Sequence, residues 1–229
     1  MNRCSVTASP TSCQTYLLVR GRSRGYRSGA VRTLLLGLLA LLALLAGCSR
    51  TPEPPRLSEY PVPVQSRIPA NLELPAAPGD VQLKPRASYQ LTAHVMGVQK
   101  YRFDDLADVV PYDFALAWSD AATPEVMRQL SVRQSGRWYY WRASAESMKS
   151  LPPSGTLNRS MANTHMVPGT EAAAKALSRV RPGDSIRAQG YLVDLLGPTP
   201  RLSRATSLSR TDSGAGACEI FYVTDLEIL

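Results

Sequence analysis

Apolar positions along this chain change their spacing several times, and each spacing predicts a different local structure. Residues 34–46 form a nearly unbroken apolar run, interrupted only by Gly37. From Ser88 to Val98 apolar and polar residues alternate, which is the pattern of a strand with one buried face. The alternation returns from Ser185 to Leu196, where Gly190 suits a bulge. The pattern therefore predicts one apolar segment followed by a strand-rich region.

Local signals place two short helices between the strands. Thr123-Pro124-Glu125 offers a hydroxyl cap, a proline at the first helical position and an acid near the positive end of the helix dipole. This helix is expected to end near Leu130. Gly169-Thr170-Glu171 predicts the start of a second helix, and Arg181-Pro182-Gly183-Asp184 has the residues of a type II turn after it.

Two further strands complete the predicted set. Arg137 to Arg142 follows a turn at Ser135-Gly136, and the last strand runs from Cys218 to about Leu226. Strands outnumber helices and do not alternate with them in βαβ order. We therefore expect a strand-rich α+β fold, either an antiparallel sheet or a small, partly open barrel of possibly OB-like form, with two short helices.

The apolar run near the N-terminus has the features of a secretory signal. Its length of about a dozen residues falls short of the roughly 20 that span a bilayer, and several arginines precede it. Leu45-Ala46-Gly47-Cys48 resembles the lipobox of bacterial lipoproteins, in which the cysteine is lipidated and becomes the new N-terminus. We expect a cleaved signal peptide over residues 1–47, although a later translation start, for example at Val31, would shorten it.

A proline-rich segment separates the lipidated Cys48 from the rest of the chain. Residues 51–85 hold nine prolines and almost no apolar periodicity, so residues 48–85 are predicted to form a tether. A short piece such as Val62-Pro63-Val64 could still dock on the domain. Residues 86–229 then have the length of one globular domain.

Removal of the leader changes the charge and the cysteine content. The whole chain has 26 basic and 18 acidic residues, but six of the arginines lie in residues 1–47, which leaves 20 against 18 and a net charge of +2. Binding to nucleic acid is therefore not indicated. Cys4 and Cys13 leave with the leader and Cys48 is acylated. Cys218 remains as the only free thiol, so no intramolecular disulfide is expected.

Four residues offer the groups of a thiol nucleophile with its base and orienting partner. Cys218 and Glu219 stand at the start of the last predicted strand, and Asn163 and His165 lie in the block Ala162–Pro168. The alternative is a buried cysteine and a histidine that caps a loop. His94, with His165 and Cys218, lacks the spacing of a zinc motif, so neither a metal nor another cofactor is expected.

Two other stretches are candidates for binding. Trp138, Tyr140 and Arg142 lie in an aromatic strand that could stack bases or sugars, although core packing also explains such a strand. Asp212 and Gly214 lie in a glycine-rich loop that could present backbone N–H groups to an anion or form a tight turn. The hydrolase motif H-E-x-x-H is absent from the sequence, and G-x-S-x-G occurs only at residues 21–25, within the predicted leader.

Four blocks occur in an order that resembles a family of uncharacterised bacterial membrane-associated proteins. They are QSGRWYYWR (134–142), ANTHMVP (162–168), VRPGDSIRAQGYLV (180–193) and SRTDSGAGACE (209–219), which include the ANxH and GAGACE patterns. The resemblance implies a shared fold and an envelope location, and no activity. Residues 198–207 lack the tryptophans expected before the last block.

These observations lead to three functional hypotheses. The first is a lipid-anchored envelope protein whose non-catalytic domain faces the periplasm and binds a protein or glycan partner. The second is a thiol-dependent enzyme that uses Cys218 and His165. The third is a structural subunit of an envelope complex. Ser49 after the lipidated cysteine, in place of an aspartate, resembles lipoproteins of the outer membrane.

Overall fold

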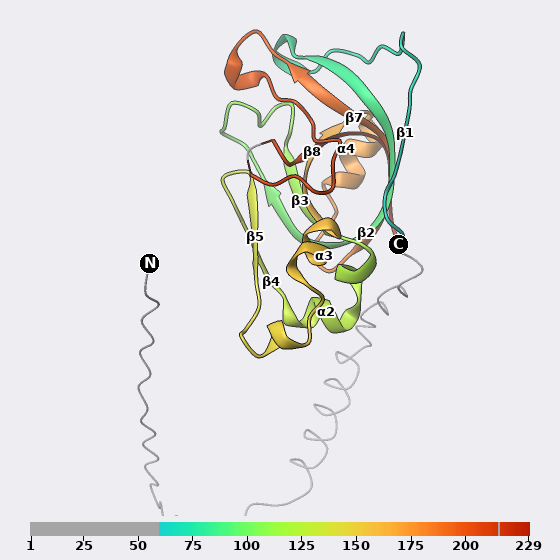
Figure 1. Ribbon diagram of the computed structural model, residues 1–229. Helices are drawn as coiled ribbons and strands as arrows, with labels where there is room; N and C mark the ends of the chain where they lie inside the picture. Colours follow the sequence, from blue (N-terminus) through green and yellow to red (C-terminus); the bar gives the residue numbers. More distant parts are fainter. Residues whose placement is uncertain (1–59, 215) are drawn as a thin grey trace, which may run out of the picture. The chain divides into compact units, whose positions relative to one another are not determined.

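The computed structural model describes residues 60–214 and 216–229 (Figure 1). The predicted leader, the lipobox Leu45–Cys48 and the first part of the proline-rich segment lie outside the described residues. Within the described part of the chain, no helix is both long and apolar enough to cross a membrane.

Strands dominate the described residues, as the polar and apolar pattern predicts. The strands are β1 (Val64–Ser66), β2 (Gln82–Lys100), β3 (Tyr112–Ala117), β4 (Ser131–Ser135), β5 (Trp138–Arg142), β6 (Met161–Pro168), β7 (Ser185–Leu196) and β8 (Glu219–Ile228). The α-helices are short: α2 (Pro124–Gln129), α3 (Ser154–Arg159) and α4 (Glu171–Leu177). The predicted strand-rich α+β class is thus confirmed, with three α-helices in the described ranges where two were expected.

The main sheet has the order β1-β2-β3-β6-β8-β7, and β2 also pairs with β7, so that five strands form a ring of pairings. β2 makes both contacts because residues 82–94 pair with β7 and residues 94–100 pair with β3, with register shifts after Pro85 and Val95 that bend the strand. The sheet is mixed and not wholly antiparallel, since β6 and β8 run parallel. The narrower OB-like form stays a prediction.

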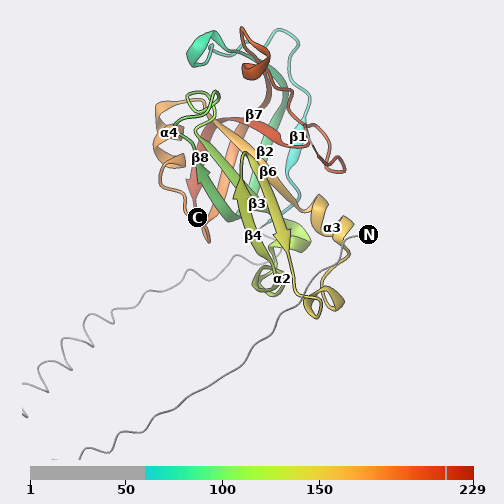
Figure 2. The same cartoon turned by 90° about the vertical axis from the view of Figure 1, so that its left-hand side faces the viewer.

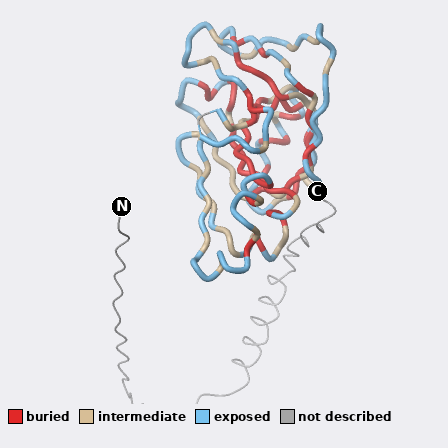
Figure 3. The backbone as a smooth tube through the Cα atoms, in the orientation of Figure 1, coloured by how far each residue is buried: buried red, intermediate tan, exposed pale blue. Residues whose placement is uncertain are grey.

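Both faces of the sheet are buried along part of its length. β8 shows this most clearly, because Phe221 and Val223 enter the larger core cluster while Ile220 and Tyr222 enter a second one. Figure 3 shows the buried residues concentrated in the main sheet, and the exposed ones at the loops and along the β4–β5 hairpin. Strands buried on both faces lack polar alternation.

Several residues between 60 and 85 pack on this fold, although residues 48–85 were predicted to form a tether. Tyr60 is fully buried and its hydroxyl lies 2.7 Å from Ser185 Oγ. β1 pairs with β2 next to the Val62-Pro63-Val64 piece expected to dock. Sequence reasoning placed the boundary too late because Tyr60 and the short β1 stand among prolines, where no periodicity reveals burial.

The predicted caps and turns occur where the sequence placed them. Thr123 Oγ1 accepts from Val126 N at the start of α2, and Thr170 Oγ1 accepts from Ala173 N at the start of α4. Gly183 has a φ of 98° in the turn that leads into β7. α4 packs through Ala173, Ala176 and Leu177 on the larger core cluster.

The β4–β5 hairpin forms a separate two-stranded sheet beside β3 (Figure 2). Its turn consists of Gly136 and Arg137, both with positive φ (58° and 66°), as a two-residue type I′ turn requires. Gly97 lets β4 approach β2, because a Cβ there would lie 2.6 Å from the Gln134 side chain. The hairpin thereby comes close to β3 and β6, which carry the polar groups described below.

Gly190 provides a test of the ring of pairings. The register of β7 on β8 shifts at this residue, as the predicted bulge requires, and a Cβ would meet Tyr222 O at 2.0 Å. We expect Gly190→Ala to lower the free energy of unfolding by about 3 kcal/mol, since backbone atoms must move. Gly183→Ala, with positive φ but open space, should cost only about 1 kcal/mol. Urea unfolding followed by circular dichroism measures both, and equal losses would contradict the close approach.

Candidate functional site

A buried carboxylate and a histidine face each other across β3 and β6. Asp113 and His165 are direct partners in the antiparallel register. Asp113 Oδ1 lies 2.7 Å from His165 Nδ1, and the Asp113 side chain is only 1% exposed. Nδ1 is therefore occupied, which leaves Nε2 as the ring nitrogen available to a further group.

Cys218 reaches the same place from the loop before β8. β8 runs parallel to β6 with Glu219 opposite Thr164, so the residue before it comes close to Asn163. Asn163 Nδ2 lies 3.9 Å from Cys218 Sγ, and His165 also interacts with the Cys218 side chain. Cys218 is partly exposed. The structure thus brings a thiol, an imidazole and a carboxylate together in one group.

Asp113 is held by donors from several segments of the chain. Its Oδ2 accepts from the Tyr101 hydroxyl at 3.1 Å and from Asn163 Nδ2 at 3.3 Å. Gln134 Nε2 donates to Asn163 Oδ1 at 2.9 Å and so orients that amide. A buried carboxylate needs such partners to offset its lost hydration. The network therefore fixes the carboxylate against His165.

Arg137 ties the turn of the β4–β5 hairpin to this network. Its guanidinium forms a two-point ion pair with Asp104 (2.9 and 2.7 Å) and lies 3.3 Å from Asp113 Oδ1. The Tyr101 ring lies under the guanidinium carbon at 3.9 Å. A positive φ is unfavourable for a residue with a side chain, so these contacts offset the cost of the turn.

His165 has a pKa that its surroundings raise. Burial of the ring acts to lower it, but the hydrogen bond and charge of Asp113, together with those of Cys218, outweigh burial and raise the pKa of His165 to about 9. The imidazole therefore favours its protonated form near neutral pH, in contact with the sulfur and the carboxylate.

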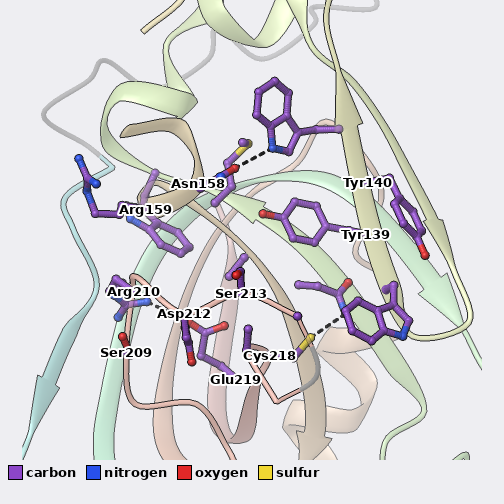
Figure 4. A pocket seen from close by; sticks show the side chains of 18 residues that line it. Tyr139, Tyr140, Asn158, Arg159, Ser209, Arg210, Asp212, Ser213, Cys218 and Glu219 are labelled. Atoms are coloured by element: carbon purple, nitrogen blue, oxygen red, sulfur yellow. Dashed lines mark hydrogen bonds and ion pairs between the residues drawn. The ribbon is translucent and has the colours of Figure 1, made fainter. Parts of the chain in front are cut away.

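An aromatic cavity of about 340 Å³ opens on one side of Cys218 (Figure 4). All three tryptophans of the chain line it, together with two tyrosines of β5: Trp118, Trp138, Tyr139, Tyr140 and Trp141. A second cavity, also about 340 Å³, includes His165 and again Cys218. Cys218 and Trp138 line both, so the thiol lies where the two cavities meet.

Glu219 is buried at the wall of the aromatic cavity. Its Oε1 accepts from Arg210 Nη1 at 3.1 Å, and the same Nη1 donates to the Tyr89 hydroxyl at 2.9 Å. Burial raises the pKa of Glu219 to about 7, although the Arg210 charge opposes the rise. Its Oε2 has no hydrogen-bond partner among the described residues.

Tyr139 points into the aromatic cavity (Figure 4). Burial, with the nearby charges of Glu219 and Cys218, raises the pKa of Tyr139 to about 12. Tyr139 therefore keeps its proton at neutral pH and offers an O–H donor close to the thiol and the carboxyl group.

The candidates chosen from the sequence divide into three groups in the structure. Cys218, His165 and Asn163 come together as a thiol site, and Glu219 lies beside them in the cavity wall. The binding candidates Trp138, Tyr140, Asp212 and Gly214 line the aromatic cavity. Arg142 does not line it and is exposed at the end of β5. The described residues contain no group of three side chains suited to a metal.

Sequence reasoning missed Asp113 and Arg137 as site residues. Asp113 stands within Tyr112–Ala117, an otherwise apolar stretch whose residues are all buried. An acid in such a stretch must have partners, and this was the available signal. Arg137 was considered only as a residue that flanks the aromatic strand.

Searches against protein families, curated proteins and solved structures found no match for this chain.

The raised pKa values of Glu219 and His165 predict how the stability of the protein depends on pH. The folded-state pKa of Glu219 is raised from 4.5 to about 7, so its stabilising contribution is lost as the pH rises through 7. The pKa of His165 is raised from 6.5 to about 9, so its contribution is lost as the pH rises through 9. The free energy of unfolding should therefore fall between pH 5 and pH 9, by at most roughly 3 kcal/mol for each group.

Urea unfolding at several pH values measures this dependence. Glu219→Gln should remove the decline below pH 7, and His165→Gln should remove most of the decline above it. A stability that is constant or rises across this range would contradict the shifted pKa values.

Proposed function

We propose that this chain is a thiol-dependent enzyme in which Cys218 attacks a carbonyl group, His165 transfers the proton and Asp113 orients the imidazole. The observation that carries the proposal is the approach of these three side chains from β3, β6 and the β7–β8 loop. In this arrangement Cys218 can act as the nucleophile, His165 as the base and Asp113 as the orienting group. We therefore favour the enzyme hypothesis over the hypothesis of a non-catalytic binding domain.

The proposed reaction is hydrolysis of an ester or amide. Before the attack the thiol proton lies on His165 Nε2, in line with the raised pKa of this imidazole. The sulfur then bonds to the carbonyl carbon while the carbonyl electron pair moves to oxygen. When the tetrahedral intermediate collapses, the bond to the leaving group breaks and His165 returns the proton to it. Water then attacks the resulting thioester, with His165 as base, and releases a carboxylic acid and the free thiol.

Asp113 and Asn163 are positioning residues in this proposal. Asp113 Oδ1 holds Nδ1, which leaves Nε2 free for proton transfer, and it stabilises the imidazolium. Asn163 Nδ2 donates to Asp113 Oδ2 and to Arg137 O while lying against the sulfur. The two cavities that meet at Cys218 offer room for the groups on either side of a scissile bond.

The proposed location rests on the sequence alone. The lipobox Leu45–Cys48 and the serine that follows it support a lipid anchor at Cys48 and attachment to the outer membrane of the cell envelope. The thiol site would then act on periplasmic material. The earlier hypothesis of a binding or accessory domain keeps one specific support, the aromatic cavity, which suits a ligand whether or not it reacts.

Alkylation of Cys218 by iodoacetamide at pH 7 tests the proposal. In the folded full-length protein we expect Cys218 to react faster than in urea, and His165→Ala should slow the native reaction at least about 10-fold, because the base is lost. Peptide mapping assigns the label among the four cysteines.

His94→Ala is the matched control, since His94 is the other histidine of the chain and does not line either cavity at Cys218. Its alkylation rate should stay within about 2-fold of the wild type. If native Cys218 reacts only after unfolding, or if His165→Ala has no effect, the thiol chemistry is refuted and the binding-domain hypothesis takes its place.

A further inference from the structure

Two buried polar atoms, on residues that line the aromatic cavity, lack partners among the described residues. Trp118 Nε1 is an N–H donor on a residue that is 1% exposed. Glu219 Oε2 belongs to a side chain that is 5% exposed. Both residues line the cavity beside Cys218. Because a buried polar group without a partner costs free energy, the pair marks a place where a ligand can both accept and donate a hydrogen bond.

The rest of the cavity wall is mostly aromatic. Tyr139 and Trp141 are half-buried, and the ring of Trp141 is fixed by a hydrogen bond from its Nε1 to Asn158 Oδ1 at 2.9 Å. Trp118 is fixed as well, because the Arg210 guanidinium carbon lies 5.1 Å from the centre of its ring. Rigid aromatic rings offer flat apolar surfaces, while Asn158 and Ser209 provide polar groups at the margin.

We propose that this cavity binds a sugar ring, so that the substrate is a carbohydrate with an ester or amide carbonyl within reach of Cys218. A sugar ring has faces of C–H groups that pack on indole and phenol rings. It also has hydroxyl or N-acylamino groups at its edge, which can accept from Trp118 Nε1 and donate to Glu219 Oε2. This inference rests on the proposed function, whose substrate class it names.

Other ligands fit these observations less well. An apolar aromatic side chain of a peptide would pack on the walls but would leave the Trp118 N–H and the Glu219 carboxyl unsatisfied. An anion would face Glu219 and Asp212. Two cations line the cavity: Arg210, which already contacts the Glu219 carboxyl and the Tyr89 hydroxyl, and Arg159, which is exposed to solvent. The cavity therefore favours a neutral ring with both donors and acceptors.

Intrinsic tryptophan fluorescence measures binding without a label, because every tryptophan of the chain lines this cavity. The full-length protein in detergent is titrated with cellotetraose, which carries hydroxyl groups only, and with chitotetraose, which carries N-acetylamino groups. We expect at least one of them to change the emission with saturation below about 10 mM. A phenylalanine-containing tetrapeptide without tryptophan serves as the competing ligand.

Two variants test the assigned atoms. Trp118→Phe keeps an aromatic ring but removes the N–H, and Glu219→Gln keeps the shape but changes the acceptor. Each should weaken binding roughly 5-fold or more, as the loss of one hydrogen bond implies. Circular dichroism confirms that each variant is folded. Phe103→Ala, a highly exposed aromatic residue outside the cavity, should leave the affinity unchanged.

Cys218→Ala separates this inference from the thiol chemistry. Sugar binding that persists in Cys218→Ala supports the binding site, including when alkylation has already refuted the enzyme. Absence of binding by both tetrasaccharides, binding of the tetrapeptide alone, or equal affinities in wild type, Trp118→Phe and Glu219→Gln would each overturn the inference, and none of these results would refute a reactive Cys218.

Discussion

The buried carboxylate of Asp113 is the constraint on which the arrangement of this site depends. A charge that is almost fully removed from water must be met by donors, and Asp113 has them from Tyr101, Arg137, Asn163 and His165. These donors belong to three different segments of the chain, because Asn163 and His165 both lie on β6. Loss of one partner of such a buried group costs about 3 to 5 kcal/mol, so the segments are held in one arrangement.

This constraint links the sheet to the cavity. The register of β3 on β6 sets His165 opposite Asp113, and the parallel pairing of β6 with β8 sets the start of β8 beside Asn163. Arg137 then fastens the β4–β5 hairpin to the same carboxylate. The hairpin carries the aromatic wall, so the thiol, its base and the binding surface are positioned by one polar network.

The fold class and several elements could be predicted because their signals are local. The cap at Thr123, the cap at Thr170 and the alternation of Ser185–Leu196 each depend on neighbours in sequence. β3 and β6 gave no such signal, since strands buried on both faces have no alternation. The parallel pairing of β6 with β8 is a long-range property that no short stretch encodes.

Only part of the candidate site could be predicted, because only some of its residues are recognisable from the sequence without tertiary contacts. Cys218 and His165 stand out because a lone thiol and a scarce histidine are recognisable by type. Asp113 and Arg137 act through tertiary contacts, and the sequence contains many acids and arginines. Their roles become visible only when the register of β3 and the turn of the hairpin are known.

The ionisation of His165 tests the central claim most directly. The chain has only two histidines, so ¹⁵N chemical shifts of the imidazole rings can be assigned by comparison with His94→Ala. The account predicts that His165 is protonated on both nitrogens at pH 7 and titrates near pH 9, and that Asp113→Asn lowers this pKa. A neutral His165 ring at pH 7 that titrates near 6.5, unaffected by Asp113→Asn, would contradict it.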